Sequence, residues 1–118
     1  MLVLSLYPAE FITLIAFLSR ISREQLNVPV TSQPLAITVL LAYQEKLSMG
    51  RIFAWQQRNT KRAYRFQLPV PVAKAFHQEM QATLLTPLQQ ALLHQFDLAL
   101  INYRSPQQQI NVLPEFIN

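Results

Sequence analysis

The pattern of hydrophobic positions at the start of the chain changes from a strand period to a helix period. Leucine occupies every second position across Leu2–Leu6, which is the spacing of a β-strand with one buried face. Pro8 follows and suits the first position of a helix. Apolar residues then recur at helical spacing, so the sequence predicts a strand over 2–7 and a helix from 8 to about 23.

A second helix is predicted after a connecting segment, residues 26–32. It begins at Pro34 and is apolar on nearly all sides as far as Tyr43. A helix without a wide polar face is usually buried on all sides. We therefore expect this helix to lie at the centre of the core.

Two interpretations of residues 50–57 are open. In the first, the second helix continues through Gly50 to Gln57, at a cost of about 1 kcal/mol for an interior glycine. In the second, Gly50 ends the helix in a left-handed cap and the residues after it form a hairpin with 62–68. The adjacent apolar pair at 52–53 interrupts strand alternation, which favours the continued helix.

The second half of the chain repeats the strand-to-helix pattern. Residues 62–68 alternate as a strand, and the prolines after them end it and start a third helix with apolar residues across 72–80. Thr86 and Gln89 have the spacing of a capping box, which predicts a fourth helix ending near Tyr103.

These elements predict a mainly helical α+β fold, with about four helices around a two- or three-stranded antiparallel sheet. The two halves match as a β-α-α pseudo-repeat, although two copies can also match by chance. We expect residues 1–106 to form a single compact domain. The tail, residues 107–118, is apolar enough to dock on this core or on a partner, through Ile110, Val112, Leu113, Phe116 and Ile117.

Composition supports a folded chain in a reducing compartment. The chain has 118 residues, 51% of them apolar, and no cysteine, so disulfides and thiolate metal sites are excluded. Its apolar runs are shorter than the roughly 18 to 20 residues of a membrane span, and no signal-peptide pattern begins the sequence. We expect a cytoplasmic protein without a membrane partner.

The sequence offers little material for catalysis. Its six acidic residues are dispersed, and a single glycine cannot build a phosphate-cradling loop. His94 and Asp97 are three apart on the predicted fourth helix and could meet, but a metal site needs three or four ligands. We assign no catalytic, cofactor-binding or metal-binding residue and expect a protein that is not an enzyme.

Positive charge is concentrated in the middle of the chain. The net charge is +4, and no acidic residue lies between Glu45 and Glu79. This makes the segment 46–65 a candidate surface for nucleic acid or another polyanion, where arginine and lysine would neutralise phosphates and the tryptophan would stack on a base. A tryptophan packed in the core is the plainer alternative. The candidate contacts are Arg51, Trp55, Arg58, Lys61, Arg62 and Arg65.

Two functions are therefore compatible with the sequence. The favoured one is a small protein-interaction or accessory domain that pairs with another protein or with a second copy of itself. The alternative is a small nucleic-acid-binding protein that uses the segment 46–65. Charge reversal in the segment 46–65 would abolish nucleic-acid binding and leave a protein interaction intact.

Overall fold

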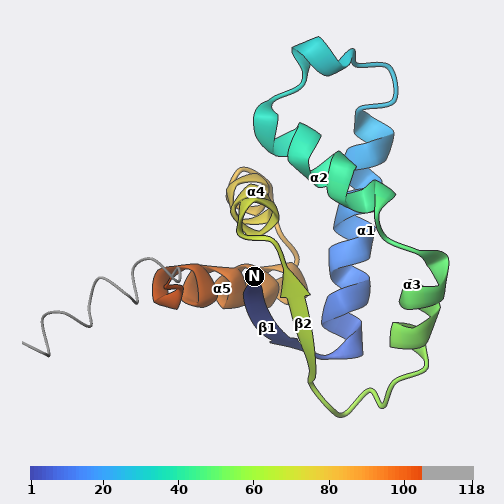
Figure 1. Cartoon of the computed structure of the whole chain (residues 1–118), viewed down its shortest axis with the longest axis vertical. Helices are drawn as coiled ribbons and strands as arrows, with labels where there is room; N and C mark the ends of the chain where they lie inside the picture. Colours follow the sequence, from blue (N-terminus) through green and yellow to red (C-terminus); the bar gives the residue numbers. More distant parts are fainter. Residues whose placement is uncertain (105–118) are drawn as a thin grey trace, which may run out of the picture.

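A computed structural model describes residues 1–104. It is a mainly helical α+β fold in which two strands lie between helices (Figure 1). A short 3-10 turn, Val30–Ser32, interrupts the connection after the first helix. In chain order the elements are β1 (Leu2–Leu6), α1 (Pro8–Glu24), α2 (Leu35–Glu45), α3 (Met49–Gln56), β2 (Tyr64–Leu68), α4 (Val70–Gln81) and α5 (Pro87–Asn102).

The two predicted strands pair with each other as an antiparallel sheet. Leu2 lies opposite Leu68 and Leu6 lies opposite Tyr64. Because side chains alternate across a strand, the leucines of β1 all face the core, as the sequence predicted. The other face carries exposed residues, including Arg65, so helices cover one side of this sheet.

Capping residues define where α1 and α5 begin. The backbone amide of Tyr7 donates to Oε1 of Glu10 at 2.8 Å, which satisfies an amide at the entrance of α1. At α5, the amide of Gln89 donates to Oγ1 of Thr86 at 3.2 Å, and the amide of Thr86 donates to Oε1 of Gln89 at 3.0 Å. The predicted capping box is confirmed.

Residues 46–57 differ from both interpretations of the sequence. The second helix ends at Glu45, and a separate helix, α3, begins after Ser48, whose Oγ accepts from the amide of Arg51 at 3.1 Å. The hairpin was therefore wrong. The favoured helical interpretation is confirmed for Met49–Gln56, but not as a continuation of the second helix. Gly50 lies in the first turn of α3 with a negative φ, so it is neither a left-handed cap nor an interior break.

The extra helix also changes the comparison between the two halves. The residues described by the structure contain five α-helices, where about four were predicted. Because α3 has no counterpart between α5 and residue 104, the β-α-α pseudo-repeat is matched only in part.

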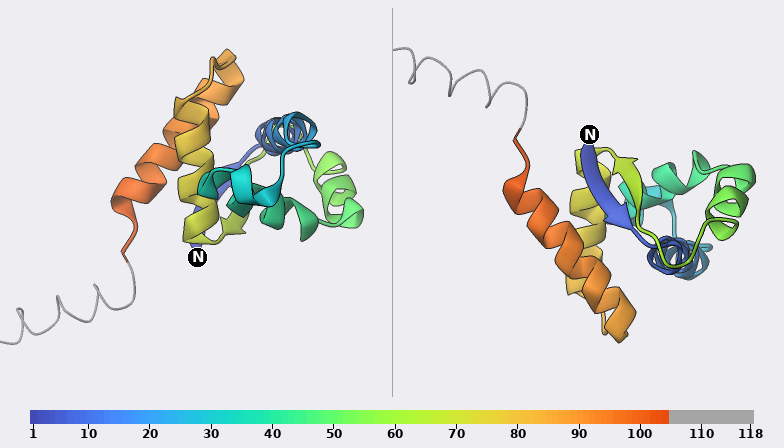
Figure 2. Two further views of the ribbon diagram at one scale, coloured as in Figure 1. Left: turned by 90° about the horizontal axis from the view of Figure 1, so that it is seen from above. Right: turned by 90° about the horizontal axis from the view of Figure 1, so that it is seen from below.

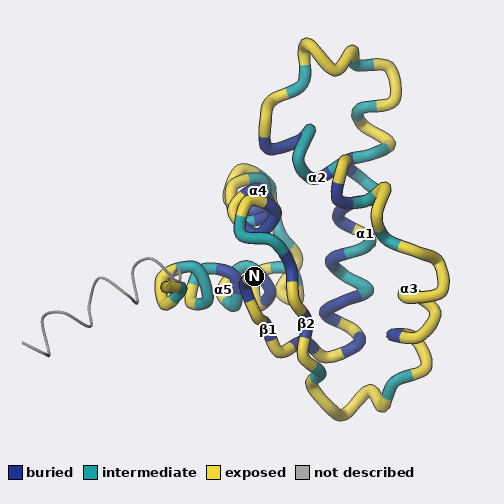
Figure 3. Tube along the Cα trace, in the orientation of Figure 1, coloured by how far each residue is buried: buried dark blue, intermediate teal, exposed yellow. Residues whose placement is uncertain are grey.

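The centre of the core is α1 and not α2. Helix α1 packs against α2, α3, α5 and β1, whereas α2 leaves Leu35 79% exposed. The expectation of a fully buried second helix was wrong because α2 packs against α4 and α1 (Figure 1) and leaves the rest of its surface exposed (Figure 3). Five phenylalanines fill one connected hydrophobic cluster: Phe11, Phe17, Phe66, Phe76 and Phe96.

Within residues 1–104, none of the helices has both the length and the apolar character needed to cross a bilayer. The five apolar tail residues named above, and the prediction that they dock, lie outside the described residues.

Candidate functional site

The cationic side chains of the segment 46–65 come from three kinds of local structure. Arg51 lies in α3, Arg65 lies on the outer face of β2, and Arg58, Lys61 and Arg62 belong to the loop between them. The loop is held by its own hydrogen bonds, because Oδ1 of Asn59 accepts from the amide of Lys61 at 3.0 Å. Lys61 and Arg62 are exposed on this loop.

Trp55 does not have the surface role that base stacking requires. Its side chain is only 3% exposed, and its ring stacks on Phe11 with centroids 4.4 Å apart and planes 10° apart. The guanidinium of Arg58 lies 4.3 Å from the same ring and 4.6 Å from the ring of Tyr64. A base cannot stack on an indole covered in this way, so any polyanion would meet only the basic side chains.

The fold brings Arg51 and Arg65 together although they are far apart in the sequence. With Gln67 they line a shallow hollow of about 250 Å³ between α3 and β2. The guanidinium carbon of Arg51 also lies 5.4 Å from the ring centroid of Phe66. None of the five candidate cations forms an ion pair with a carboxylate in the part of the chain that the structure describes.

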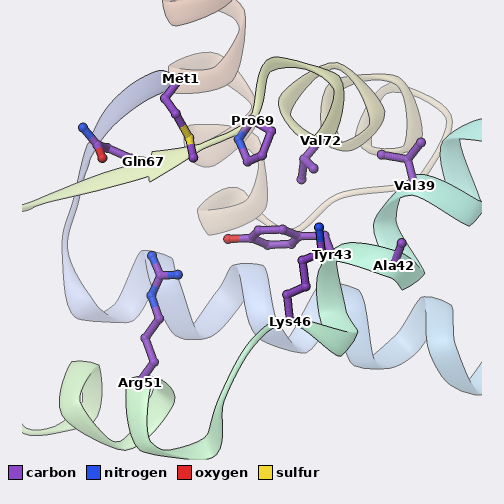
Figure 4. A pocket seen from close by; sticks show the side chains of 9 residues that line it. All are labelled: Met1, Val39, Ala42, Tyr43, Lys46, Arg51, Gln67, Pro69 and Val72. Atoms are coloured by element: carbon purple, nitrogen blue, oxygen red, sulfur yellow. The ribbon is translucent and has the colours of Figure 1, made fainter.

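A larger pocket of about 480 Å³ lies beside this hollow and shares Arg51 with it (Figure 4). Its walls come from α2, α4 and the end of β2, and Lys46 stands at its rim. The ring of Tyr43 crosses the pocket, with its hydroxyl on the side of Arg51 and Gln67. From the sequence we expected Tyr43 in the core, and its hydroxyl was the one feature of this residue that could indicate another role.

The hydroxyl of Tyr43 is in an unusual environment. The residue is 8% exposed, and its hydroxyl oxygen is buried without a hydrogen-bond partner among the described residues. Burial raises the pKa of this phenol, while the positive charge of Arg51 acts in the opposite direction. The hydroxyl therefore keeps its proton at neutral pH and is a donor without an acceptor.

The histidines do not form a metal site in the described part of the chain. Nε2 of His77 lies 3.1 Å from Oδ1 of Asp97, so Asp97 is paired with a residue on α4 and not with its predicted neighbour His94. Within residues 1–104 no three potential metal ligands come together.

The outer side of α5 forms a second exposed surface of a different kind. Only Leu92 and Phe96 of this helix are fully buried, while Leu98 is 46% exposed and Ile101 is 62% exposed. Figure 2 shows α5 at one edge of the molecule, with α4 on one side of it and the other side turned outward.

Comparison with protein-family models, with curated proteins and with solved structures gave no match.

Proposed function

We propose that this chain is a non-enzymatic protein-interaction domain that pairs with a second copy of itself through the outer side of α5. The observation that carries the proposal is that a helix with apolar residues on all sides is covered on one side only. Leu88, Leu98 and Ile101 are between 42% and 62% exposed on it. Apolar patches of this kind mark interaction sites more often than isolated exposed leucines do.

The spacing of the exposed residues supports a helix-to-helix contact. Ala91, His94, Leu98 and Ile101 are all exposed and are separated by three, four and three positions. This is the spacing of the a and d positions in a coiled-coil seam. Helix α5 is about 24 Å long, enough for two heptads.

A second copy of this chain is the partner that fits the face best. The four positions of the seam are uncharged when His94 is neutral, so two copies meet there without like-charge repulsion. The one carboxylate of α5, on Asp97, is already occupied by His77 of the neighbouring helix. A two-fold axis would place the same face of each copy against the other.

The test is the molar mass of the full chain in solution, measured by light scattering over a range of concentrations. The seam is short, so we expect a weak dimer with a dissociation constant on the order of micromolar. The double variant Leu98→Glu with Ile101→Glu should be a monomer throughout this concentration range, because its dimer interface would bury unpaired charges. Leu35→Glu, at an exposed leucine of α2, is the control and should dimerise as the unmodified chain does.

A molar mass equal to that of one chain at all concentrations contradicts the proposal. A dimer that persists in the double variant of α5 contradicts it as well. Circular dichroism of the double variant checks that α5 remains folded.

Nucleic acid is the second candidate ligand, and the convergence of Arg51 and Arg65 favours it. The two guanidinium groups share one hollow, with Lys61 and Arg62 exposed on the adjoining loop and no carboxylate paired to them among residues 1–104. Such a surface would contact phosphates and not base edges, because Trp55 is buried.

Binding of labelled single-stranded and duplex DNA at about 50 and about 200 mM salt tests this candidate. Affinity should fall steeply with salt, since neutralised phosphates release counterions. Lys61→Glu with Arg62→Glu should abolish binding, whereas Arg23→Glu, a single charge reversal at the end of α1, should leave most of it. Absence of binding at the lower salt concentration would exclude this function.

A further inference from the structure

The pocket crossed by Tyr43 has the features of a ligand site. Its volume of about 480 Å³ is within the range of small-molecule sites, roughly 300 to 1,000 Å³. Most of the lining is apolar, and Val39 and Val72 approach each other across it from α2 and α4 (Figure 4). Few but convergent polar groups in an apolar cavity are typical of sites that orient a ligand.

The hydroxyl of Tyr43 and the guanidinium of Arg51 lie on the same side of the pocket. Figure 4 shows the guanidinium of Arg51 beside and below this hydroxyl, whereas the amide of Gln67 points away from it. Lys46 adds a second positive charge, with its nitrogen near the end of the Tyr43 ring that is away from the hydroxyl (Figure 4), and none of the described residues that line the pocket is acidic. The lining of the pocket is therefore mostly apolar, with two positive charges and no negative charge.

The hydroxyl of Tyr43 points to a ligand more specifically than the charges do. An unpaired buried donor costs about 1 to 3 kcal/mol, so buried polar groups in folded proteins are nearly always satisfied. Here the donor lies at the pocket and is more than nine-tenths buried. A carboxylate oxygen between Tyr43 and Arg51 would satisfy the hydroxyl and would also match the donor geometry of a guanidinium.

We infer that this pocket binds an amphipathic monocarboxylate, with its carboxylate held by Arg51 and Tyr43 and its apolar body lying between α2 and α4. Access to the hydroxyl requires a movement of the side chains around it. Met1 and Arg51 are exposed residues with flexible side chains, so this movement is local. The inference does not depend on the proposed dimer, because the walls of the pocket lie apart from the outer side of α5. The pocket does share Arg51 and Gln67 with the hollow described for the nucleic-acid candidate.

Titration of the full chain with decanoate tests the inference, with calorimetry for affinity and amide NMR shifts for location. Decanol has the same apolar body without the charge and should bind at least tenfold more weakly. The amides that shift with decanoate should be those of α2, α4 and the end of β2.

Three variants separate a carboxylate site from general hydrophobic binding. Tyr43→Phe should weaken decanoate about fivefold, the value of one hydrogen bond, and Arg51→Gln should weaken it about tenfold or more. Ala42→Phe should block the apolar part of the pocket without touching its polar groups. Arg62→Gln removes the same charge as Arg51→Gln from an exposed loop and should bind like the unmodified chain.

Tyr43→Phe also protects the test from a folding artefact, because removing an unsatisfied hydroxyl does not destabilise a core. The inference is overturned if decanoate produces no shift at the pocket. It is equally overturned if decanol binds as tightly, or if Tyr43→Phe and Arg51→Gln both bind decanoate as the unmodified chain does.

Discussion

At the scale of single residues, Glu10 is the one buried acidic side chain among residues 1–104. It is 6% exposed and accepts hydrogen bonds from the amide of Tyr7 and from Nε2 of Gln95. These bonds join the start of α1 to the middle of α5, which lie far apart in the sequence. The carboxylate therefore helps to position the helix that we propose as the dimer surface.

Glu10→Ala should lower the free energy of unfolding by about 1 to 3 kcal/mol, because both donors lose their buried acceptor. Urea unfolding followed by circular dichroism measures this change. Glu24→Ala is the control, since Glu24 forms only an exposed contact of 3.7 Å with Arg20 and should cost less than about 0.5 kcal/mol. Equal losses in the two variants would show that the Glu10 bonds add little.

Tyr43 should make stability depend on pH in the alkaline range. Burial raises the pKa of its phenol above the ordinary value of 10.0. The unfolded chain then loses the proton at a lower pH than the folded chain does, so the stabilising contribution is complete below pH 10.0 and is lost as pH rises through the folded pKa. Unfolding measured between neutral pH and the alkaline limit should show a smaller loss for Tyr43→Phe than for the unmodified chain. Parallel curves would contradict this account of the hydroxyl.

At the scale of secondary-structure elements, α3 is the least supported by packing. Only Trp55 of its eight residues is fully buried, and Ser48 caps its first turn. Gly50 lies in that turn with nothing within 4 Å of the position a Cβ would take. Its backbone has no positive φ, so no conformational reason requires glycine there.

Gly50→Ala should therefore stabilise the chain by about 0.5 to 1 kcal/mol, because alanine loses less backbone entropy on entering a helix. Thermal unfolding measures this gain. Met49→Ala, at the exposed neighbouring position, is the control and should change stability little. A destabilised Gly50→Ala chain would mean that α3 does not form as described.

Elements with a local signal were predicted well from the sequence. The alternation of β1 and β2 and the Thr86–Gln89 capping box are patterns within a few residues of each other, and all three are confirmed. The break after Glu45 was missed because the residues on both sides of Ser48 tolerate a helix. The sequence does not show that Ser48 caps a new helix instead of lying inside a continuous one. The partial exposure of α2 was also missed, since hydrophobicity alone does not reveal which neighbours an apolar helix has.

The candidate sites were predictable only in part, for the same reason. The excess of positive charge over 46–65 was evident, but the meeting of Arg51 and Arg65 depends on how α3 lies against β2. Trp55 could be interpreted as a surface or a core residue until its contact with Phe11 was known. The pocket at Tyr43 depends on three elements that are distant in sequence, and no local pattern predicts such an arrangement.

At the scale of the whole molecule, the tail 107–118 provides a separate prediction. If its apolar residues dock on the domain or on a partner, a chain truncated after Ser105 should lose thermal stability or change its mass in solution. A chain ending at 105 that keeps the stability, mass and partners of the full chain would contradict the docking prediction. The double variant Ile110→Ser with Val112→Ser is compared with the truncated chain, because it keeps the full length of the tail and removes only part of its apolar character.

The central claim is that α5 joins two copies of the chain, and cysteine cross-linking tests it most directly. The chain contains no cysteine, so each single substitution at Ala91, His94, Leu98 or Ile101 introduces the only thiol. A disulfide forms only where two Cα atoms approach to about 4.4 to 6.8 Å. We predict that under mild oxidation at least one of these four variants forms a covalent dimer much faster than Phe53→Cys, an exposed control on α3. If all four cross-link no faster than that control, the α5 surface is not the interface and the proposed function is wrong.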